Sequence, residues 1–495
     1  MSANQRANTI STTILKAKAL VVIKGKNNEE ETRNGMNGMK KSPASTALLN
    51  ICLFIGTIVT WSQYMKKIRQ KAYSALRNTE HMFKTDMVYL SKSSFWTTLR
   101  FVIGTVASIG TMIAFGNLLP KETYGLYSYL MSLAGSLGFL TLTGASSGVL
   151  RATARGQGNI LPYATKLQLR YSTLATLTIA GGAFYYWVNG NNVFALSLFI
   201  LSITLPLASV YHIYEAVLIG RKRFDTLTII SGISTLIASG STILALFFTQ
   251  NILFLLTIYA FFSLAPNIFA YLYVKRDIST ENPSPDSIAD LRKTSFHLTG
   301  ASLIGVFAQQ IDKIILFQVA GPAALAIYGF AMAGPERLKG LVKNWAVAAL
   351  PILAVKSVND VRHMFYKRIF FTLILGIILS TFYILLSPIL FHWFLPNYYD
   401  AIIYSQIYSL SLIVIPAGVY IGQVLVGQNM LRAVYAYSIG SQTLRILLFV
   451  ALGWKWQIWG LIIASIAYYT ASMIYSIIVW EIETRRLVKK QLNNL

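Results

Sequence analysis

Long apolar runs recur along almost the whole chain, and they constrain its fold more than any other feature. From Phe95 onward these runs measure about 18 to 25 residues, the length that a helix needs to cross a hydrocarbon core roughly 30 Å thick. The short alternating strands of a membrane barrel are absent. Because a spanning segment must satisfy its backbone hydrogen bonds internally, the sequence predicts an all-α integral membrane protein.

The runs predict twelve transmembrane helices. They lie at approximately 95–119, 124–145, 171–188, 193–219, 226–248, 251–274, 296–320, 323–353, 368–391, 401–427, 434–453 and 457–480. The composition agrees, since 55% of the 495 residues are hydrophobic, 12% are charged and the mean hydropathy is +0.54. We therefore expect a bundle of membrane-spanning helices.

The loops between these spans fall into two sets of opposite charge density. One set carries Arg151, Arg155, Lys166, Arg170, Arg221, Lys222, Arg223, Lys275, Arg276, Arg292, Lys293, Lys356, Arg362, Lys367 and Arg368, and the tail adds Arg485, Arg486, Lys489 and Lys490. The other set offers little beyond Lys121 and Lys455. The positive-inside rule makes the first set cytoplasmic, with both ends of the twelve-helix unit inside. This asymmetry accounts for the net charge of +25 without a nucleic-acid partner.

Several function classes lack their signature. The only cysteine is Cys52, the five histidines are not spaced as metal ligands, and no Walker A loop occurs. We expect no metal, no cofactor, no catalytic residue and no ATPase activity.

The predicted domain plan has five parts. Residues 1–92 form an extension that is partly disordered, 93–274 the first six-helix bundle, 275–295 a cytoplasmic linker, 296–480 the second six-helix bundle and 481–495 a cytoplasmic tail. Within the extension, 46–64 is a further candidate membrane helix; a surface-lying helix, or a start at Met82 or Met87, is the alternative. A faint repeat supports two related bundles, since IAFGNLLP (113–120) matches ILFQVAGP (315–322) and VLIG (217–220) matches VLVG (424–427).

Charged residues inside two predicted spans are the candidate site. In the seventh span Gly305, Gln309, Asp312 and Lys313 fall on one helical arc, which we expect to face the bundle interior or a hydrated cavity. Interhelix salt bridges are the structural alternative for this pair of charges.

The eighth span carries Glu336, Arg337, Lys339 and Lys343, of which all but Arg337 share a face. An interfacial helix is the alternative there. Further charges lie in other spans: Arg445 in the eleventh, Arg100 in the first, and Glu215, close to His212, in the fourth, the last two with snorkelling as an alternative. A cavity with more cations than anions suits a phosphate or pyrophosphate.

The segment IDKIILFQVAGPAALAIYGFA (311–331) resembles the seventh-helix signature of polysaccharide repeat-unit flippases. In that signature an Asp and a basic residue precede an apolar run, a Gly-Pro turn and a Gly-x-Tyr-like element; here Ala326 replaces the last glycine. LLPKETYGLYSYLMSL (118–133), YEAVLIGRKRF (214–224) and FLPNYYDAI (394–402) also resemble family elements, so the likeness covers about residues 90–480.

This resemblance implies the superfamily of multidrug, oligosaccharidyl-lipid and polysaccharide exporters, with two six-helix bundles around a central cavity. The polysaccharide branch flips an undecaprenyl-pyrophosphate-linked oligosaccharide across the bacterial inner (plasma) membrane for surface polysaccharides such as the O-antigen of lipopolysaccharide. The expected partners are this lipid, membrane lipids, and the polymerase and glycosyltransferases of the same pathway. The substrate-binding cations would be Arg100, Lys313, Arg337, Lys339, Lys343 and Arg445, and the coupling or charge-balancing acids Glu215, Asp312 and Glu336.

Three alternatives stay open from the sequence. A multidrug or cation antiporter of the same superfamily should carry an acid deep in its early helices, where this chain has Arg100. A polysaccharide polymerase or lipid-linked glycosyltransferase, the enzymatic alternative, generally needs a large outer loop, whereas the longest here, around FHWFLPNYYD, has only some ten residues. A scaffold would leave the buried charges purely structural.

Overall fold

A computed structural model describes residues 87–277, 282–348, 353 and 358–492 of the chain. Residues 1–86, with the candidate helix predicted at 46–64, lie outside this range, as does Lys356. The chain divides into two compact units, Met1–Ser91 and Lys92–Leu495. The second unit holds all the described helices except the first residues of α4.

The described residues form helices and short 3-10 turns, without strands. The first half contains α4 (Met87–Leu118), α5 (Lys121–Ser136), η1 (Gly138–Thr141), α6 (Ala145–Ala154), α7 (Leu161–Val188), α8 (Asn192–Tyr211), α9 (Tyr214–Gly220), α10 (Phe224–Phe248) and α11 (Ile252–Arg276). The second half contains α12 (Pro285–Ala308), α13 (Ile311–Ala348), α15 (Val358–Phe394), η2 (Pro396–Tyr398), α16 (Ala401–Ser409), η3 (Leu410–Ile413), α17 (Ile415–Gly427) and α18 (Leu431–Leu492). The predicted all-α fold class is confirmed.

Helix α13 consists of two antiparallel arms, 311–320 and 322–348. Gly321 between them has φ 80° and ψ −178°, a conformation that only glycine adopts readily. The Tyr328 hydroxyl donates to Asp312 Oδ2 at 3.0 Å, although sixteen residues would separate them by about 24 Å on a straight helix. The Gly-Pro turn that the sequence indicated is therefore a full reversal of the chain.

Helix α18 reverses in the same way at Trp456 and Gln457, whose backbone angles are not helical. Its arms, 431–455 and 458–492, lie side by side, because the Tyr437 hydroxyl lies 2.9 Å from that of Ser472. A second contact a little further along confirms the pairing: the Tyr475 hydroxyl donates to the carbonyl of Ala436 at 3.1 Å.

Each of the twelve predicted ranges overlaps a helix, but the count of spans stays a prediction. Among the described residues, eight helices are long and apolar enough to cross a membrane, or up to nine if the bent pair 121–136 and 138–154 is one span. Two of these, 285–346 and 431–486, contain the reversals of α13 and α18. Helix α7, at the third predicted span, does not pass this test. The division into two six-helix bundles is likewise untested.

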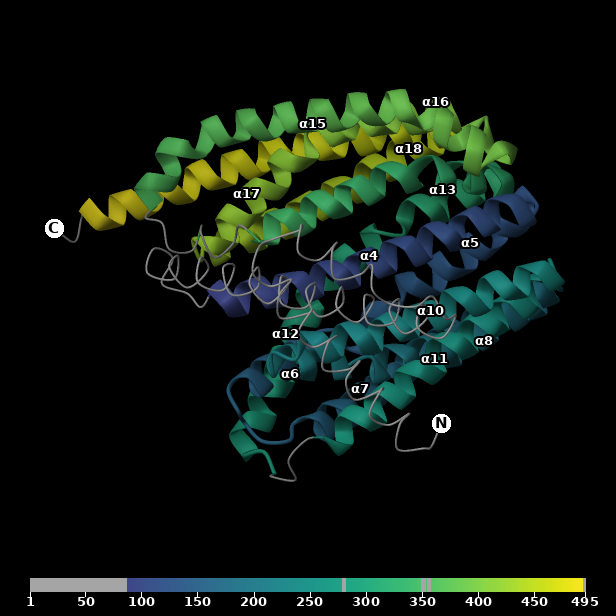
Figure 1. Ribbon diagram of the computed structural model, residues 1–495, viewed down its shortest axis with the longest axis horizontal. Helices are drawn as coiled ribbons and strands as arrows, with labels where there is room; N and C mark the ends of the chain where they lie inside the picture. The colour runs from purple at the N-terminus through teal and green to yellow at the C-terminus, as the bar shows by residue number, and fades with distance from the viewer. Residues whose placement is uncertain (1–86, 278–281, 349–352, 354–357, 493–495) are drawn as a thin grey trace, which may run out of the picture. The chain divides into compact units, whose positions relative to one another are not determined.

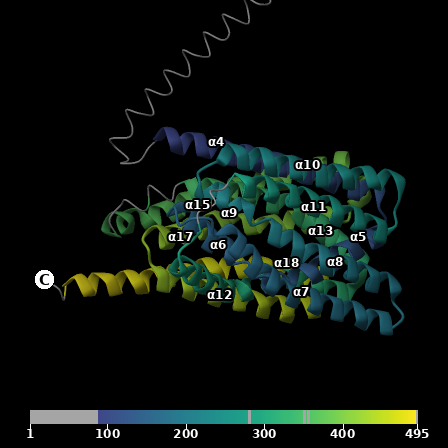
Figure 2. The ribbon, with the colours of Figure 1, turned by 90° about the horizontal axis from the view of Figure 1, so that it is seen from below.

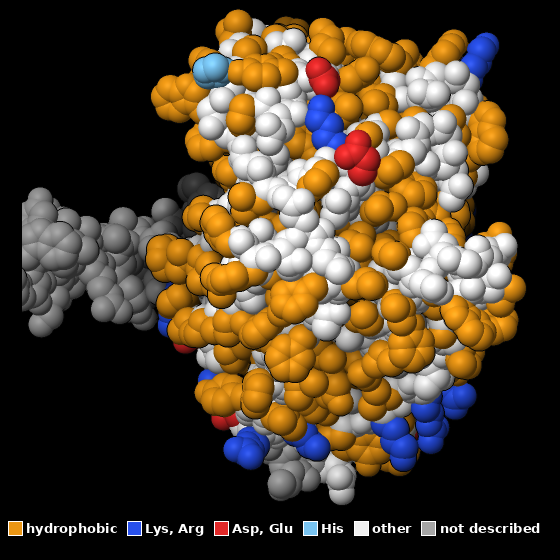
Figure 3. All heavy atoms as spheres, turned by 90° about the vertical axis from the view of Figure 1, so that its right-hand side faces the viewer, with side chains coloured by type: hydrophobic (Ala, Val, Ile, Leu, Met, Phe, Trp, Pro, Cys, Tyr) orange, Lys and Arg blue, Asp and Glu red, His pale blue; other side chains and the backbone are white. Residues whose placement is uncertain are grey.

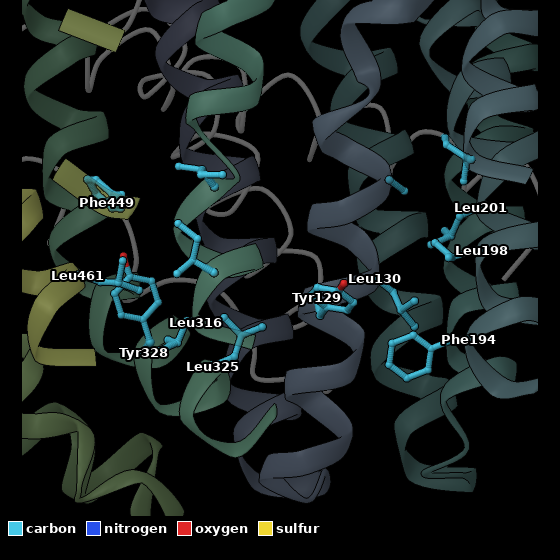
Figure 4. Packing of buried hydrophobic residues seen from close by; sticks show 14 of the residues in the cluster. Tyr129, Leu130, Phe194, Leu198, Leu201, Leu316, Leu325, Tyr328, Phe449 and Leu461 are labelled. Atoms are coloured by element: carbon cyan, nitrogen blue, oxygen red, sulfur yellow. The ribbon is translucent and has the colours of Figure 1, made fainter. Parts of the chain in front are cut away.

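Helix α5 joins the two halves of the chain. In Figures 1 and 2 it runs beside α13, against which it packs closely. Tyr129 of α5 stacks on Phe317 of α13 with ring centroids 3.8 Å apart and accepts a hydrogen bond from Gln318 at 3.0 Å. Figure 4 shows the buried cluster around this contact, with Leu198 of α8 on one side and Leu316 of α13 on the other. The halves thus share one continuous core.

The surface of the second unit is that of a protein immersed in lipid. Large side chains such as Phe248, Phe269 and Leu385 are exposed by 79, 72 and 71%, and Figure 3 shows hydrophobic side chains covering most of one end. The turns at this end, called the charge-poor end below, lie at 119–120, 189–191, 249–251, 321, 395–400 and 456–457. Exposed tryptophans typical of a membrane interface flank them at Trp187, Trp393, Trp454, Trp456 and Trp459. The opposite end, with turns at 155–160, 221–223 and 428–430 and with the end of α11 and the start of α12, is called the basic end.

Candidate functional site

A network of charged and phenolic groups lies inside the second half. Glu336, on the second arm of α13, forms an ion pair with Lys339 one turn later, with 2.5 Å between Nζ and Oε2. The Tyr408 hydroxyl of α16 donates to Glu336 at 2.6 Å, and Lys339 donates to the Tyr469 hydroxyl of α18 at 2.9 Å. Three helices therefore hold one ion pair, which reduces the cost of placing charges in an apolar bundle.

Asp312 and Arg445 form the deeper part of this network. Asp312 is 2% exposed and receives the hydrogen bond from Tyr328 already described. Arg445 packs against the rings of Phe449 and Tyr468, 5.1 and 5.6 Å from their centroids, and attracts both Asp312 and Glu336 electrostatically. Asp312 Oδ1 and Arg445 Nε are both buried without a hydrogen-bond partner in the structure.

The polar arc predicted for the seventh span is interrupted. Helix α12 ends at Ala308 and α13 begins at Ile311, so Gln309 and Gln310 form a break. Asp312 lies in the first turn of α13, where the positive end of the helix dipole stabilises a carboxylate. Gln309 is exposed and Asp312 is buried, so the two residues have different surroundings, and the expectation that the arc faces the interior or a hydrated cavity stays a prediction.

The first half contains a separate charged cluster. Arg100 of α4 donates to Glu215 of α9, with 2.5 Å between Nη2 and Oε1, and His212 Nε2 lies 3.2 Å from the same oxygen. The Glu215 side chain is 12% exposed. This pair connects the first and fourth predicted spans, so Arg100 has a carboxylate partner and does not join the charges of the second half within the described structure.

The remaining candidates lie on α13. Lys313 is half-buried, whereas Arg337 and Lys343 are exposed. The face predicted to unite Glu336, Lys339 and Lys343 therefore divides, since the first two form an ion pair and Lys343 lies beyond it. Helix α13 continues without interruption from Pro322 to Ala348, so these charges belong to a membrane-length helix.

Sequence reasoning missed a set of contacts between the halves at the charge-poor end. We call it the charge-poor latch. It consists of the ion pair between Lys121 Nζ and Asp400 Oδ2 at 3.1 Å, the hydrogen bond from Asn117 to the Phe394 carbonyl at 2.8 Å and that from Asn397 to the Gly116 carbonyl at 3.2 Å. The signal that could have revealed it is the pair of family-like segments LLPKETYG and FLPNYYD, which hold three of these side chains.

Tyr398 packs against the lysine of the charge-poor latch. Its side chain is fully buried, and Lys121 Nζ lies 5.3 Å from the ring centroid. Burial, together with Tyr124 and Glu122, raises the pKa of the Tyr398 phenol, so the ring stays neutral and can face the ammonium group.

Ion pairs also occur at the basic end. Arg155 lies 3.7 Å from Asp290, which links the end of α6 to α12, and Arg223 pairs with Asp277 beyond α11. In the described ranges no three side chains of His, Cys, Asp or Glu lie together as a metal site.

Comparisons with known proteins agree with this architecture. Residues 90–357, more than half of the chain, match the family model described as polysaccharide biosynthesis protein. A comparison with curated protein sequences found no match.

Solved structures with the same fold are transporters by their descriptions. The chain is similar to the inward-facing conformation of a multidrug resistance MATE family transporter of the MOP superfamily, with TM-score 0.59, 14% identity, and 79% of this chain and 99% of that chain covered. It is also similar to an outward-facing conformation of such a transporter, with TM-score 0.54, 14% identity and coverage of 81 and 96%. The chain therefore belongs to the polysaccharide biosynthesis protein family and has the fold of the MATE transporters of the MOP superfamily.

Proposed function

We propose that this protein is a flippase that moves a pyrophosphate-linked oligosaccharide lipid across the bacterial inner membrane by alternating access. The family and the fold support the general class, and a transporter requires no catalytic residue. The positive-inside rule supports a cytoplasmic basic end and C-terminus. The substrate is undecaprenyl pyrophosphate carrying a repeat unit of a surface polysaccharide such as the O-antigen of lipopolysaccharide.

The observation that carries this proposal is the charge balance of the second arm of α13. It bears Arg337, Lys339 and Lys343 but only one acid, Glu336. The side chains of Lys339 and Glu336 are 29 and 35% exposed, although charges at mid-membrane are costly unless they face water or a counter-ion. An excess of reachable cations fits a pyrophosphate, which accepts charge-assisted hydrogen bonds from each of them.

Alternating access also fits the arrangement of the halves. The charge-poor latch and the packing of α5 on α13 close one end of the protein in this conformation. Release of a substrate at that end requires these contacts to part. The acids would balance charge or couple transport to an ion; they are Asp312, Glu336 and Glu215. Two further cations, Arg445 and Lys313, would add to the positive potential around the headgroup. Arg100 would contribute least, because it forms an ion pair with Glu215.

The test is flipping of a fluorescent undecaprenyl-pyrophosphate oligosaccharide in reconstituted vesicles. We expect Lys339→Gln with Lys343→Gln to reduce the rate about tenfold or more, since each cation contributes one charge-assisted contact. Lys343→Gln alone separates binding from folding, because Lys343 is exposed and does not belong to the hydrogen-bonded network. Lys455→Gln, an exposed lysine at the charge-poor end, is the matched control. A wild-type protein that moves no lipid would overturn the proposal.

Export of a cationic drug is the second candidate, and the fold of the MATE transporters favours it. Helix α4 has no acidic residue that could bind a cation. The Glu215 carboxylate already forms an ion pair with Arg100. We therefore expect no drug-dependent efflux from vesicles that flip the oligosaccharide lipid. Polymerase or glycosyltransferase activity would instead change the sugar chain, which chromatography of the recovered lipid detects.

A further inference from the structure

An open apolar groove runs between α10 and α11, away from the charged network. Its volume is about 750 Å³. Helix α10 lines it with Ile229, Ile233 and Ile237, which recur every four residues and are 52, 54 and 40% exposed. Helix α11 supplies Phe261 and Phe269 on the opposite wall, 62 and 72% exposed. The groove therefore has one wall of branched side chains and one of aromatic rings.

Pro266, near the centre of α11, is part of the lining of the groove. Pro266 has no N–H for the helical hydrogen bond. Ala265 and Ala270 beside it are too small to fill the space toward α10. The α11 side of the groove therefore includes a proline and two small side chains as well as aromatic rings.

Helix α4 packs on a different side of α10. The Thr228 hydroxyl donates to the Trp96 carbonyl at 2.9 Å, and Gly232 lies against Ile103. These contacts occupy the α10 face next to the isoleucines and leave the isoleucine face itself exposed. Within the described structure the groove is open to the surroundings of the bundle, which for a membrane-length helix are lipid.

The groove covers one leaflet, at the basic end. Its lining extends from Thr226, two residues after the start of α10, to Ile237. These twelve residues span about 16 Å along a helix, which is close to half of a hydrocarbon core of roughly 30 Å. On α11 the lining ends at Tyr273, three residues before the helix does. A chain lying in the groove would therefore have its headgroup at the basic end.

The mouth of the groove is positively charged. Lys275 and Arg276, both exposed, follow Tyr273 on α11 after the buried Val274. Across the mouth, Arg221 and Arg223 precede α10 and both pair with Asp277. Asp225, in the first turn of α10, is a second acid there, so the basic residues still outnumber the acids. Basic side chains near the membrane surface attract an anionic headgroup. The groove thus combines a slot for an apolar chain with a site for a phosphate.

We propose that this groove holds the isoprenoid chain of the lipid-linked substrate in the leaflet at the basic end, with its phosphate groups facing Lys275 and Arg276. This inference rests on the proposed function and names where the tail lies before the headgroup enters the protein. A polyprenyl lipid has one methyl-branched chain, which suits a single slot between branched and aromatic walls; a phospholipid has two unbranched chains. The charged network of the second half would then receive the pyrophosphate as the halves move.

The test uses a photoactivatable undecaprenyl phosphate with the full-length protein in nanodiscs, and mass spectrometry locates the crosslinks. We expect labelling on α10 and α11, competed by undecaprenyl phosphate and not by phosphatidylglycerol. Ile233→Trp fills the groove and should reduce this labelling about tenfold. The matched control is Leu244→Trp, on the same helix and 60% exposed but outside the groove, which should label as the wild type does.

Three results would overturn the groove proposal. They are equal competition by phosphatidylglycerol, labelling spread evenly over the lipid-facing helices, and undiminished labelling of a folded Ile233→Trp protein. Flipping of the oligosaccharide lipid is measured in parallel. Flipping without labelling of the groove would reject this site and leave the proposed function standing. Specific labelling by a wild-type protein that flips nothing would support the site and contradict the proposed function.

Discussion

The seam between α5 and α13 allows a sharp prediction, because Gly125 has no room for a side chain. A Cβ at this position would lie 1.9 Å from the carbonyl oxygen of Pro322. That distance is roughly 1.5 Å short of the 3.4 Å at which ordinary van der Waals contact begins. The obstacle is backbone directly after the reversal at Gly321, so it cannot rotate away as a side chain would. We therefore expect Gly125→Ala to push α5 from α13.

The expected cost is about 1 to 3 kcal/mol, the usual penalty of overpacking. Because the contact closes the charge-poor end, the penalty falls on this conformation and shifts the equilibrium toward the open one. If that state avoids the clash, its population relative to the closed state rises about 5 to 150-fold. Gly418→Ala is the matched control, since a Cβ there meets nothing within 4 Å and both glycines are helical. Subtracting the effect of Gly418→Ala from that of Gly125→Ala removes the gain in helix propensity that alanine brings at both positions.

Two measurements check this prediction. Spin labels at Asn192 and Lys455, both exposed at the charge-poor end, report the distance between the halves in a Cys52→Ser background. Thermal unfolding in detergent reports stability. Gly125→Ala should widen the distance distribution relative to Gly418→Ala. An unchanged distribution with a loss of stability would show that the seam stays closed in both states, and would refute the reasoning that α5 and α13 separate during transport.

Three further predictions concern single contacts. Lys121→Ala removes the exposed ion pair with Asp400, so we expect under about 1 kcal/mol of lost stability but a wider distribution between the same spin labels; an unchanged distribution would show that the latch does not hold the halves. Tyr328→Phe removes the hydrogen bond that Asp312 receives from the Tyr328 hydroxyl and should lower the free energy of unfolding by about 1.5 to 3 kcal/mol. An unchanged denaturant midpoint would show that this carboxyl is protonated or hydrated. Glu336→Gln removes the countercharge inside the second half and should lower the unfolding temperature while Lys343→Gln does not; equal effects would contradict a structural role for the ion pair.

The sequence by itself determined the class of protein and the positions of its helices. Hydropathy is a local property, so the apolar run 226–248 predicts a membrane-spanning helix without reference to any other segment. Helix α10 occupies 224–248. The Gly-Pro pair at 321–322 likewise indicated the reversal in α13, because a positive φ is a local demand. The Glu336 and Lys339 pair followed from helical spacing alone.

Only the tertiary structure decided which charges meet. Arg100 and Glu215 are 115 residues apart in sequence, and Lys121 and Asp400 are 279 apart; no spacing rule connects them. The same holds for Tyr408 and Tyr469, phenols in apolar runs whose sequence gives no sign that they complete the network around Glu336. The break before Asp312 was also hidden, because its burial depends on how α12 and α13 pack on other helices. Contacts between helices follow from packing of the whole bundle, which local patterns of polarity do not encode.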